Sequence, residues 1–85
     1  MKQFNYTIKD ELGIHARPAG LLVKQAALFQ STIKIACGGK EADGKKLFAV
    51  MSLAVKKGQT VTVTAEGSDE DTAVKALQSF FELNV

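Results

Sequence analysis

The sequence of 85 residues is slightly basic and has a globular composition: 46% of the residues are hydrophobic, 24% are charged, and the formal net charge is +2. This composition excludes a disordered tail and a collagen-like repeat, and no apolar run approaches the roughly 18 residues that cross a bilayer. We expect a single small domain, spanning residues 1–85, because two domains would need about 200 residues.

The chain has features of a cytoplasmic protein that needs no metal or other cofactor. Its one cysteine, Cys37, cannot form an internal disulfide, and its first residues lack the apolar region of a secretion signal. One histidine and one cysteine cannot build a structural zinc site. Residues 1–65 carry ten Lys or Arg and four Asp or Glu, whereas residues 66–85 carry one Lys and five Asp or Glu. This asymmetry favours an acidic protein partner over nucleic acid.

Hydrophobic periodicity predicts seven elements. In chain order they are a strand at residues 4–8, a helix at 16–29, strands at 32–37 and 40–43, a short helix at 44–53, a strand at 60–66 and a final helix after residue 68. Gly38-Gly39 is a hairpin turn signal between the second and third strands. Ser68 is expected to cap the final helix, with Asp71 three residues later as a variant capping box.

These elements predict an α/β (α+β) domain with the order βαββαβα. The short connections favour a four-stranded, mostly antiparallel sheet. Three amphipathic helices would cover one of its faces, which gives a two-layer open-faced sandwich. The other face, lined by Lys34, Thr60, Thr62 and Thr64, would meet water.

The only histidine, arginine and proline of the chain stand together in the tetrapeptide His15-Ala16-Arg17-Pro18. This tetrapeptide falls where the first loop becomes the first helix, which places His15 near the N-cap. The first N–H groups of a helix have no intrahelical partner and carry the positive end of the helix dipole. The N–H groups of Ala16 and Arg17, with the Arg17 guanidinium, therefore predict a phosphate-binding site.

A histidine beside such a site has a specific chemical use. Nearby positive charge disfavours the imidazolium, so we expect His15 to be neutral at pH 7 and to offer a nucleophilic ring nitrogen. A phosphoryl group on that nitrogen would lie among donors that stabilise transferring charge without reorganisation. A histidine alone at a helix start is more often a solvated cap residue, and the neighbouring arginine is what favours phosphoryl transfer.

The segment around the histidine resembles the active-site signature of a known family. It reads Gly13-Ile14-His15-Ala16-Arg17-Pro18-Ala19. This is similar to HPr, the histidine-containing phosphocarrier of the bacterial phosphoenolpyruvate-dependent sugar phosphotransferase system, and the resemblance covers the whole chain. It implies that phosphorylated enzyme I passes a phosphoryl group to Nδ1 of His15, and that Arg17 orients the phosphate. His15 would then pass the group to the IIA domain of a sugar permease.

The resemblance also implies a monomeric carrier, which is consumed stoichiometrically and is not an enzyme in the strict sense. In this family the partner surface combines the first helix with the short helix after the third strand, which here corresponds to Gly20, Lys24, Leu47, Phe48 and Met51. The short helix has too many apolar side chains to bury them all, so some should form an exposed patch ringed by Lys24, Lys45 and Lys46. Ordinary core packing is the alternative for Leu47, Val50 and Met51.

Two residues depart from the family pattern. Lys46 stands where many relatives carry a serine that a regulatory kinase phosphorylates in Gram-positive bacteria, so we expect no regulatory serine here. Leu12 stands where relatives often carry a small polar residue that can reach the phosphohistidine. A leucine side chain cannot make that hydrogen bond.

A small RNA-binding α/β domain is the main alternative function, because residues 1–65 are basic. Against it, the exposed sheet face would carry Thr and Lys in place of stacking aromatic residues, and no RNA-binding motif is present. A catalytically inactive regulator of the HPr type is a third interpretation. The presence of His15 argues against it, because losing that residue is the simplest way to lose the chemistry.

Overall fold

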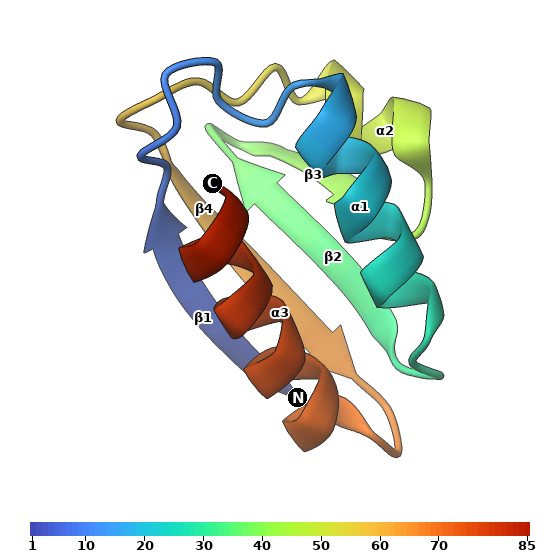
Figure 1. Ribbon diagram of the computed structural model, residues 1–85. Coiled ribbons are helices and arrows are strands. Elements are labelled where there is room, and N and C mark those ends of the chain that lie inside the picture. The colour runs from blue at the N-terminus through green and yellow to red at the C-terminus, as the bar shows by residue number, and fades with distance from the viewer.

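Seven elements follow one another in the predicted order βαββαβα in the computed structural model, which describes residues 1–85 (Figure 1). The elements are β1 (Lys2–Thr7), α1 (Ala16–Ala27), β2 (Thr32–Cys37), β3 (Lys40–Asp43), α2 (Leu47–Ser52), β4 (Thr60–Glu66) and α3 (Glu70–Asn84). The predicted bounds of β2, β3 and β4 are confirmed. None of the three helices has both the length and the apolar character to cross a membrane.

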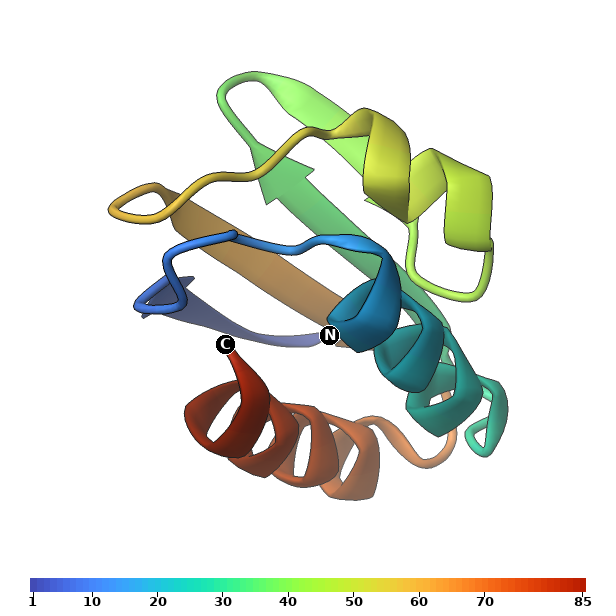
Figure 2. The same ribbon diagram turned by 45° about the horizontal axis from the view of Figure 1, so that its top comes forward.

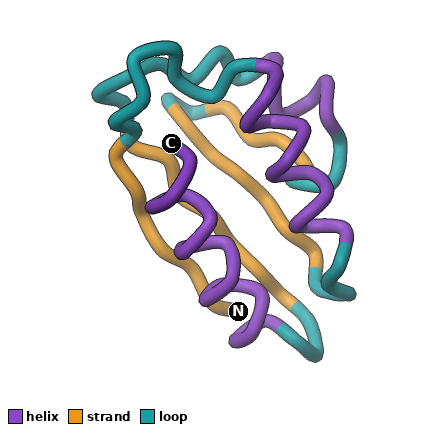
Figure 3. The backbone as a smooth tube through the Cα atoms, in the orientation of Figure 1, coloured by secondary structure: helices purple, strands orange, loops and turns teal.

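The four strands form one sheet in the order β1-β4-β2-β3. Every neighbouring pair is antiparallel, so the sheet is antiparallel throughout. Helices α1 and α3 lie side by side on one face of this sheet (Figures 2 and 3), and α2 packs against α1 and β3. The predicted open-faced sandwich is confirmed. Its topology brings the start of α1 beside the segment that links α2 to β4.

The core lies between the sheet and the helices. Alternate residues of the two central strands point into it, and Ile33, Ile35, Val61 and Val63 are fully buried. From the helices, Phe81 is buried against β1, where its ring lies 5.9 Å from that of Phe4 and 5.6 Å from that of Tyr6, measured between centroids. Each buried aliphatic or aromatic side chain contributes about 1.5–3 kcal/mol, so this layer holds α1 and α3 on the sheet.

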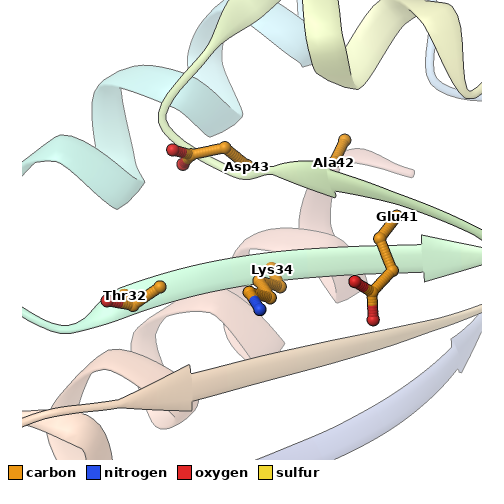
Figure 4. A pocket seen from close by; sticks show the side chains of 5 residues that line it. All are labelled: Thr32, Lys34, Glu41, Ala42 and Asp43. Carbon is orange, nitrogen blue, oxygen red and sulfur yellow. The ribbon is translucent and has the colours of Figure 1, made fainter.

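The face of the sheet away from the helices is polar. Figure 4 shows a shallow hollow on it, lined by Thr32 and Lys34 of β2 and by Glu41, Ala42 and Asp43 of β3. Lys34 and Thr60 are exposed, and Thr62 and Thr64 are half-buried. The expectation that this face meets water is confirmed. The hollow is remote from the residues that carry the predicted chemistry, because the first turn of α1 belongs to the other layer.

Helix α1 ends at Ala27, two residues before the predicted Phe29. The N–H of Phe29 donates to the carbonyl of Ala26 at 3.2 Å, three residues back, so the chain tightens into a turn after the helix. The Phe29 carbonyl accepts a hydrogen bond from the Lys45 ammonium at 2.7 Å. This contact comes from a residue 16 positions away, which local periodicity could not have revealed.

Helix α2 begins at Leu47 rather than at Gly44, so the predicted start was three residues too early. The N–H of Gly44 donates to the carbonyl of Ile33 at 2.8 Å, and the N–H of Lys45 donates to the carboxylate of Asp43 at 2.9 Å. An aspartate side chain that bonds two residues ahead forms a turn in place of a helix. The apolar spacing was correct, but the turn delays the helix.

The prediction that Ser68 caps α3 was wrong. Asp69 occupies the N-cap position, and its carboxylate makes no capping bond. Instead it accepts hydrogen bonds at 2.9 Å from the N–H groups of Gln30 and Ser31, and a further bond from the Ser31 hydroxyl. These bonds, the Ser31 hydroxyl above all, hold the pKa of Asp69 below its usual range. The carboxylate thus links the start of α3 to the turn between α1 and β2.

Candidate functional site

His15 occupies the N-cap position of α1. Its backbone is extended, with φ −87° and ψ −174°, and its carbonyl accepts a hydrogen bond from the N–H of Ala19 at 3.0 Å. The side chain is half-buried and makes no capping hydrogen bond to the helix. The imidazole is therefore held at the helix start by the backbone, while its ring nitrogens stay free for chemistry.

Two backbone donors stand directly after His15 without a partner. The N–H groups of Ala16 and Arg17 donate to no group of the protein, as expected for the first turn of a helix. Pro18, the third residue of the helix, has no N–H and is buried. The free donors of this turn are thus limited to the two residues that the sequence singled out for phosphate binding.

Arg17 adds a permanent positive charge to these two amides. Its side chain is exposed, and none of the three ion pairs in the structure includes it. A guanidinium presents its N–H groups in a planar fork that matches the oxygens of a phosphate. The free amides and the free guanidinium belong to two consecutive residues at the start of α1, which is the kind of donor set that an anion needs.

The loop before His15 is fixed by backbone contacts. Gly13 has φ +67°, and its N–H donates to the carbonyl of Asp10 at 2.9 Å. The N–H of Ile14 donates to the carbonyl of Val55 at 3.0 Å. A Cβ atom at Gly13 would lie only 2.1 Å from that same Val55 oxygen, so no other residue fits without moving the loop. These contacts set the position from which the imidazole projects.

The end of α3 supports the same loop from below (Figures 1 and 2). The main-chain oxygen of Val85 accepts hydrogen bonds from the N–H groups of Lys9 at 2.7 Å and Asp10 at 2.9 Å. Val85 itself is buried. This oxygen therefore anchors the loop at Lys9 and Asp10, which lie six and five residues before His15.

The predicted partner residues lie on two helices that touch each other. Phe48 is 81% exposed and Met51 is 36% exposed, whereas Val50, between them in sequence, is buried in the core. The other residues predicted for this surface are an exposed Lys24 and the half-buried Gly20 and Leu47. An apolar patch therefore faces solvent on α2. Helix α2 lies next to α1 (Figure 1).

Two features of this patch differ from the expectation. Lys45 does not ring it, because the Lys45 side chain is half-buried and its ammonium is bonded to the Phe29 carbonyl. Leu21 of α1, which the sequence analysis missed, is 40% exposed. Its spacing could have revealed it: it follows Arg17 by four residues and precedes Lys24 by three, so all three share one helix face.

The two residues that depart from the family pattern are both exposed. Lys46 is the N-cap residue of α2 and makes no side-chain capping bond. Leu12 is 70% exposed, and its N–H donates to the Asp10 carboxylate at 2.8 Å. The backbone of Leu12 therefore belongs to a turn that this hydrogen bond stabilises. The Leu12 side chain adds an apolar group to the surface of the loop before His15.

The chain matches the family model described as the PTS HPr component phosphorylation site, over residues 2–82. It belongs to the HPr family. The chain is thus a phosphocarrier of the phosphotransferase system, and the proposed RNA-binding alternative is left without support.

Individual relatives are similar over nearly their full length. Phosphocarrier protein HPr of Mycoplasma genitalium is 40% identical over 85 residues, covering 99% of this chain and 97% of the relative. The crystal structure of HPr from Thermoanaerobacter tengcongensis superposes with a TM-score of 0.92 at 41% identity, covering 96% of this chain and 92% of that one. A dimer of the same protein has a TM-score of 0.78 at 41% identity, with 98% and 95% covered.

Proposed function

We propose that residues 1–85 form one phosphocarrier domain in which His15 accepts a phosphoryl group from phosphorylated enzyme I and passes it to the IIA domain of a sugar permease. The observation that carries this proposal is the free imidazole of His15 at the start of α1, next to the unpartnered N–H groups of Ala16 and Arg17. An imidazole is a nucleophile, and unpartnered helix amides bind anions.

The transfer step proposed here takes its attacking atom, Nδ1 of His15, from the resemblance to the HPr family. The Nδ1 lone pair of His15 attacks phosphorus, the bond from phosphorus to the donor group of enzyme I breaks, and its electron pair stays with the donor. A P–N bond to His15 forms in its place. The two amides and the Arg17 guanidinium stabilise the charge on the transferring oxygens without having to reorganise. Passing the group to the IIA domain reverses these roles.

The domain acts as a carrier and not as an enzyme in the strict sense, because each molecule is phosphorylated and consumed once per transfer. Its site has to hold the phosphoryl group only moderately well. A site that stabilised the phosphorylated form strongly would raise the barrier for the second transfer. Two amides and one guanidinium, all open to water, meet this requirement.

The protein partners dock on the surface formed by Gly20, Lys24, Leu47, Phe48 and Met51. The exposed ring of Phe48 supplies an apolar anchor, and Gly20 lets another surface approach α1 closely. Lys24 and Arg17 favour an acidic partner surface. The carrier works as a monomer in the cytoplasm, where its single cysteine, buried and unpaired, stays reduced. Sedimentation equilibrium tests this oligomeric state, and it should give the mass of a single chain.

No serine switch operates at position 46. Lysine offers no hydroxyl, and its charge is opposite to that of phosphoserine. The nearest hydroxyl in sequence, on Ser52, donates to the carbonyl of Ala49 at 2.7 Å. Mass-spectrometric mapping after incubation with the regulatory serine kinase and ATP should find no phosphoserine, and a modified Ser52 would contradict this.

Incubation with phosphoenolpyruvate and enzyme I tests the central proposal. The mass should rise by one phosphoryl group, the modification should be labile in acid, and peptide mapping should place it on His15. His15→Ala should abolish the mass change while keeping the thermal midpoint close to that of the parent. A parent chain that stays unmodified, or a His15→Ala variant that is still phosphorylated, would refute the role of His15.

A further inference from the structure

The segment between α2 and β4 packs directly against the loop that leads to His15 (Figures 1 and 2). Besides the Ile14–Val55 hydrogen bond, the backbone of Lys56 touches Gly13: an ideal Cβ on that glycine would lie 2.8 Å from the Lys56 Cα atom. Gly13 and His15 are two residues apart, so their Cα atoms are at most about 7 Å apart. The long lysine stem and a phosphorylated imidazole can bridge such a separation.

Lys56 has a fixed backbone and an uncommitted side chain. Its N–H donates to the side-chain oxygen of Gln59 at 2.7 Å, and its carbonyl accepts from the Gln59 N–H at 3.1 Å. The side chain is exposed and belongs to none of the ion pairs. The next lysine differs, because the Lys57 ammonium lies 3.4 Å from a carboxylate oxygen of Glu11. Lys56 is therefore the cation of this turn that remains available to an anion.

The charge of the phosphorylated state calls for such a cation. A phosphorylated side chain carries about −1.5 to −2 charges at pH 7. The Arg17 guanidinium neutralises one of these, and the two helix amides supply only partial charge. About 0.5 to 1 negative charge is left for a further cation, or for water.

We propose that Lys56 is a second phosphate-binding cation of the site, whose ammonium contacts the phosphoryl group on His15. This inference rests on the proposed function of His15. An ammonium on a flexible stem acts as a mobile point charge, so it can follow the phosphoryl group as the group arrives and leaves, whereas the Arg17 fork orients it. Lys56 thus binds the same oxygens from the loop side that the helix amides bind from α1.

Phosphoramidate as the phosphoryl donor tests this contact without any partner protein. Its P–N bond breaks, ammonia leaves, and a P–N bond to His15 forms. Lys56→Gln should slow phosphohistidine formation by about two- to fivefold, the range for one exposed charge contact. Lys56→Arg should restore most of the rate. Lys75→Gln, which removes an equal charge from α3 beside Lys2 and Asp71, should match the parent.

Two further measurements separate a phosphate contact from a structural or docking role. In the Lys56→Gln variant, protonation of the phosphoryl group, followed by ³¹P NMR, should occur at a higher pH than in the parent, while the thermal midpoint stays unchanged. If Lys56→Gln matches the parent with phosphoramidate, the inference is overturned, even if transfer from enzyme I is slower. Failure of the parent to form phosphohistidine, or phosphorylation of His15→Ala, would instead overturn the function on which the inference rests.

Discussion

Figure 1 shows the two ends of the sandwich, at the start and at the end of α1. These ends use their polar groups in opposite ways. At the start of α1, the N–H groups of Ala16 and Arg17 have no partner in the protein. At the other end, where a turn connects α1 to β2, the carboxylate of Asp69 accepts hydrogen bonds from the N–H groups of Gln30 and Ser31 and from the Ser31 hydroxyl. The end at Ala16 and Arg17, which we call the open end, keeps its donors free. The end at Asp69, which we call the closed end, uses its donors in a contact between distant segments.

Solvent exposure explains why both arrangements are stable. Ala16 and Arg17 are exposed, so water satisfies their N–H groups and little free energy is lost by leaving them free. Ser31 is fully buried, and an unpaired hydroxyl there would cost about 1–3 kcal/mol. No buried side-chain nitrogen or oxygen in the structure lacks a partner. The proposed binding site therefore lies where free donors cost least.

The largest effect should come from Arg17→Ala, which tests the open end. Removing a group that stabilises transferring charge slows such reactions by about 100-fold or more, so phosphoryl transfer from enzyme I should fall by that order. The thermal midpoint should not change, because the side chain is exposed and unpaired. Arg17→Lys should recover only part of the rate, because a lysine lacks the planar fork. A normal rate of phosphoryl transfer in Arg17→Ala would show that Arg17 does not stabilise the transferring phosphoryl group.

Phe48→Ala should have the next largest effect. Truncating an exposed aromatic anchor of a protein interface costs about 1–2 kcal/mol, so kcat/KM for transfer from enzyme I should fall roughly tenfold. The free energy of unfolding should hold, since Phe48 is 81% exposed. Val50→Ala on the same helix is the matched control: this residue is buried, and its truncation should lower stability instead. A loss of stability in Phe48→Ala would place its ring in the core.

Ser31→Ala tests the closed end. Loss of its hydroxyl bond to Asp69 should lower the free energy of unfolding by about 1 kcal/mol, measured with urea. Ser52→Ala removes an exposed hydroxyl and should change stability by less than about 0.5 kcal/mol. Neither variant should alter phosphoryl transfer. Slower phosphoryl transfer by Ser31→Ala would show that the two ends are coupled, and it would contradict the claim that they act independently.

Features that depend on neighbours in sequence could be predicted from the sequence. The alternation of Val61, Val63 and Ala65 was enough to define β4, and a proline three residues after His15 was enough to place the helix start. Both signals act over a few residues, where backbone geometry leaves few choices.

Features that depend on tertiary contacts could not be predicted. The sequence predicts a cap at Ser68, whereas the Asp69 carboxylate bonds to Gln30 and Ser31, which lie 39 and 38 residues away. Lys45 likewise resembles a surface cation until the fold brings the Phe29 carbonyl to it. The position of Lys56 beside Gly13 also follows from packing between two loops. No periodicity in the sequence encodes such pairs.

The smallest expected effect is a pH dependence that belongs to Asp69. Hydrogen bonds, first from the Ser31 hydroxyl and then from the Gln30 N–H, lower the pKa of Asp69 in the folded state. A carboxylate whose pKa is lower in the folded than in the unfolded chain stabilises the fold above its unfolded pKa. That contribution is lost as the pH falls through the pKa of the folded state.

In urea titrations, the stability difference between the parent and Asp69→Asn should therefore be constant above about pH 5 and shrink below about pH 4. Glu70, whose pKa is also lowered, mainly by the Met1 amino group, contributes equally to both proteins, so the difference isolates Asp69. A difference that stays constant down to pH 2 would mean that the charge of Asp69 does not stabilise the closed end.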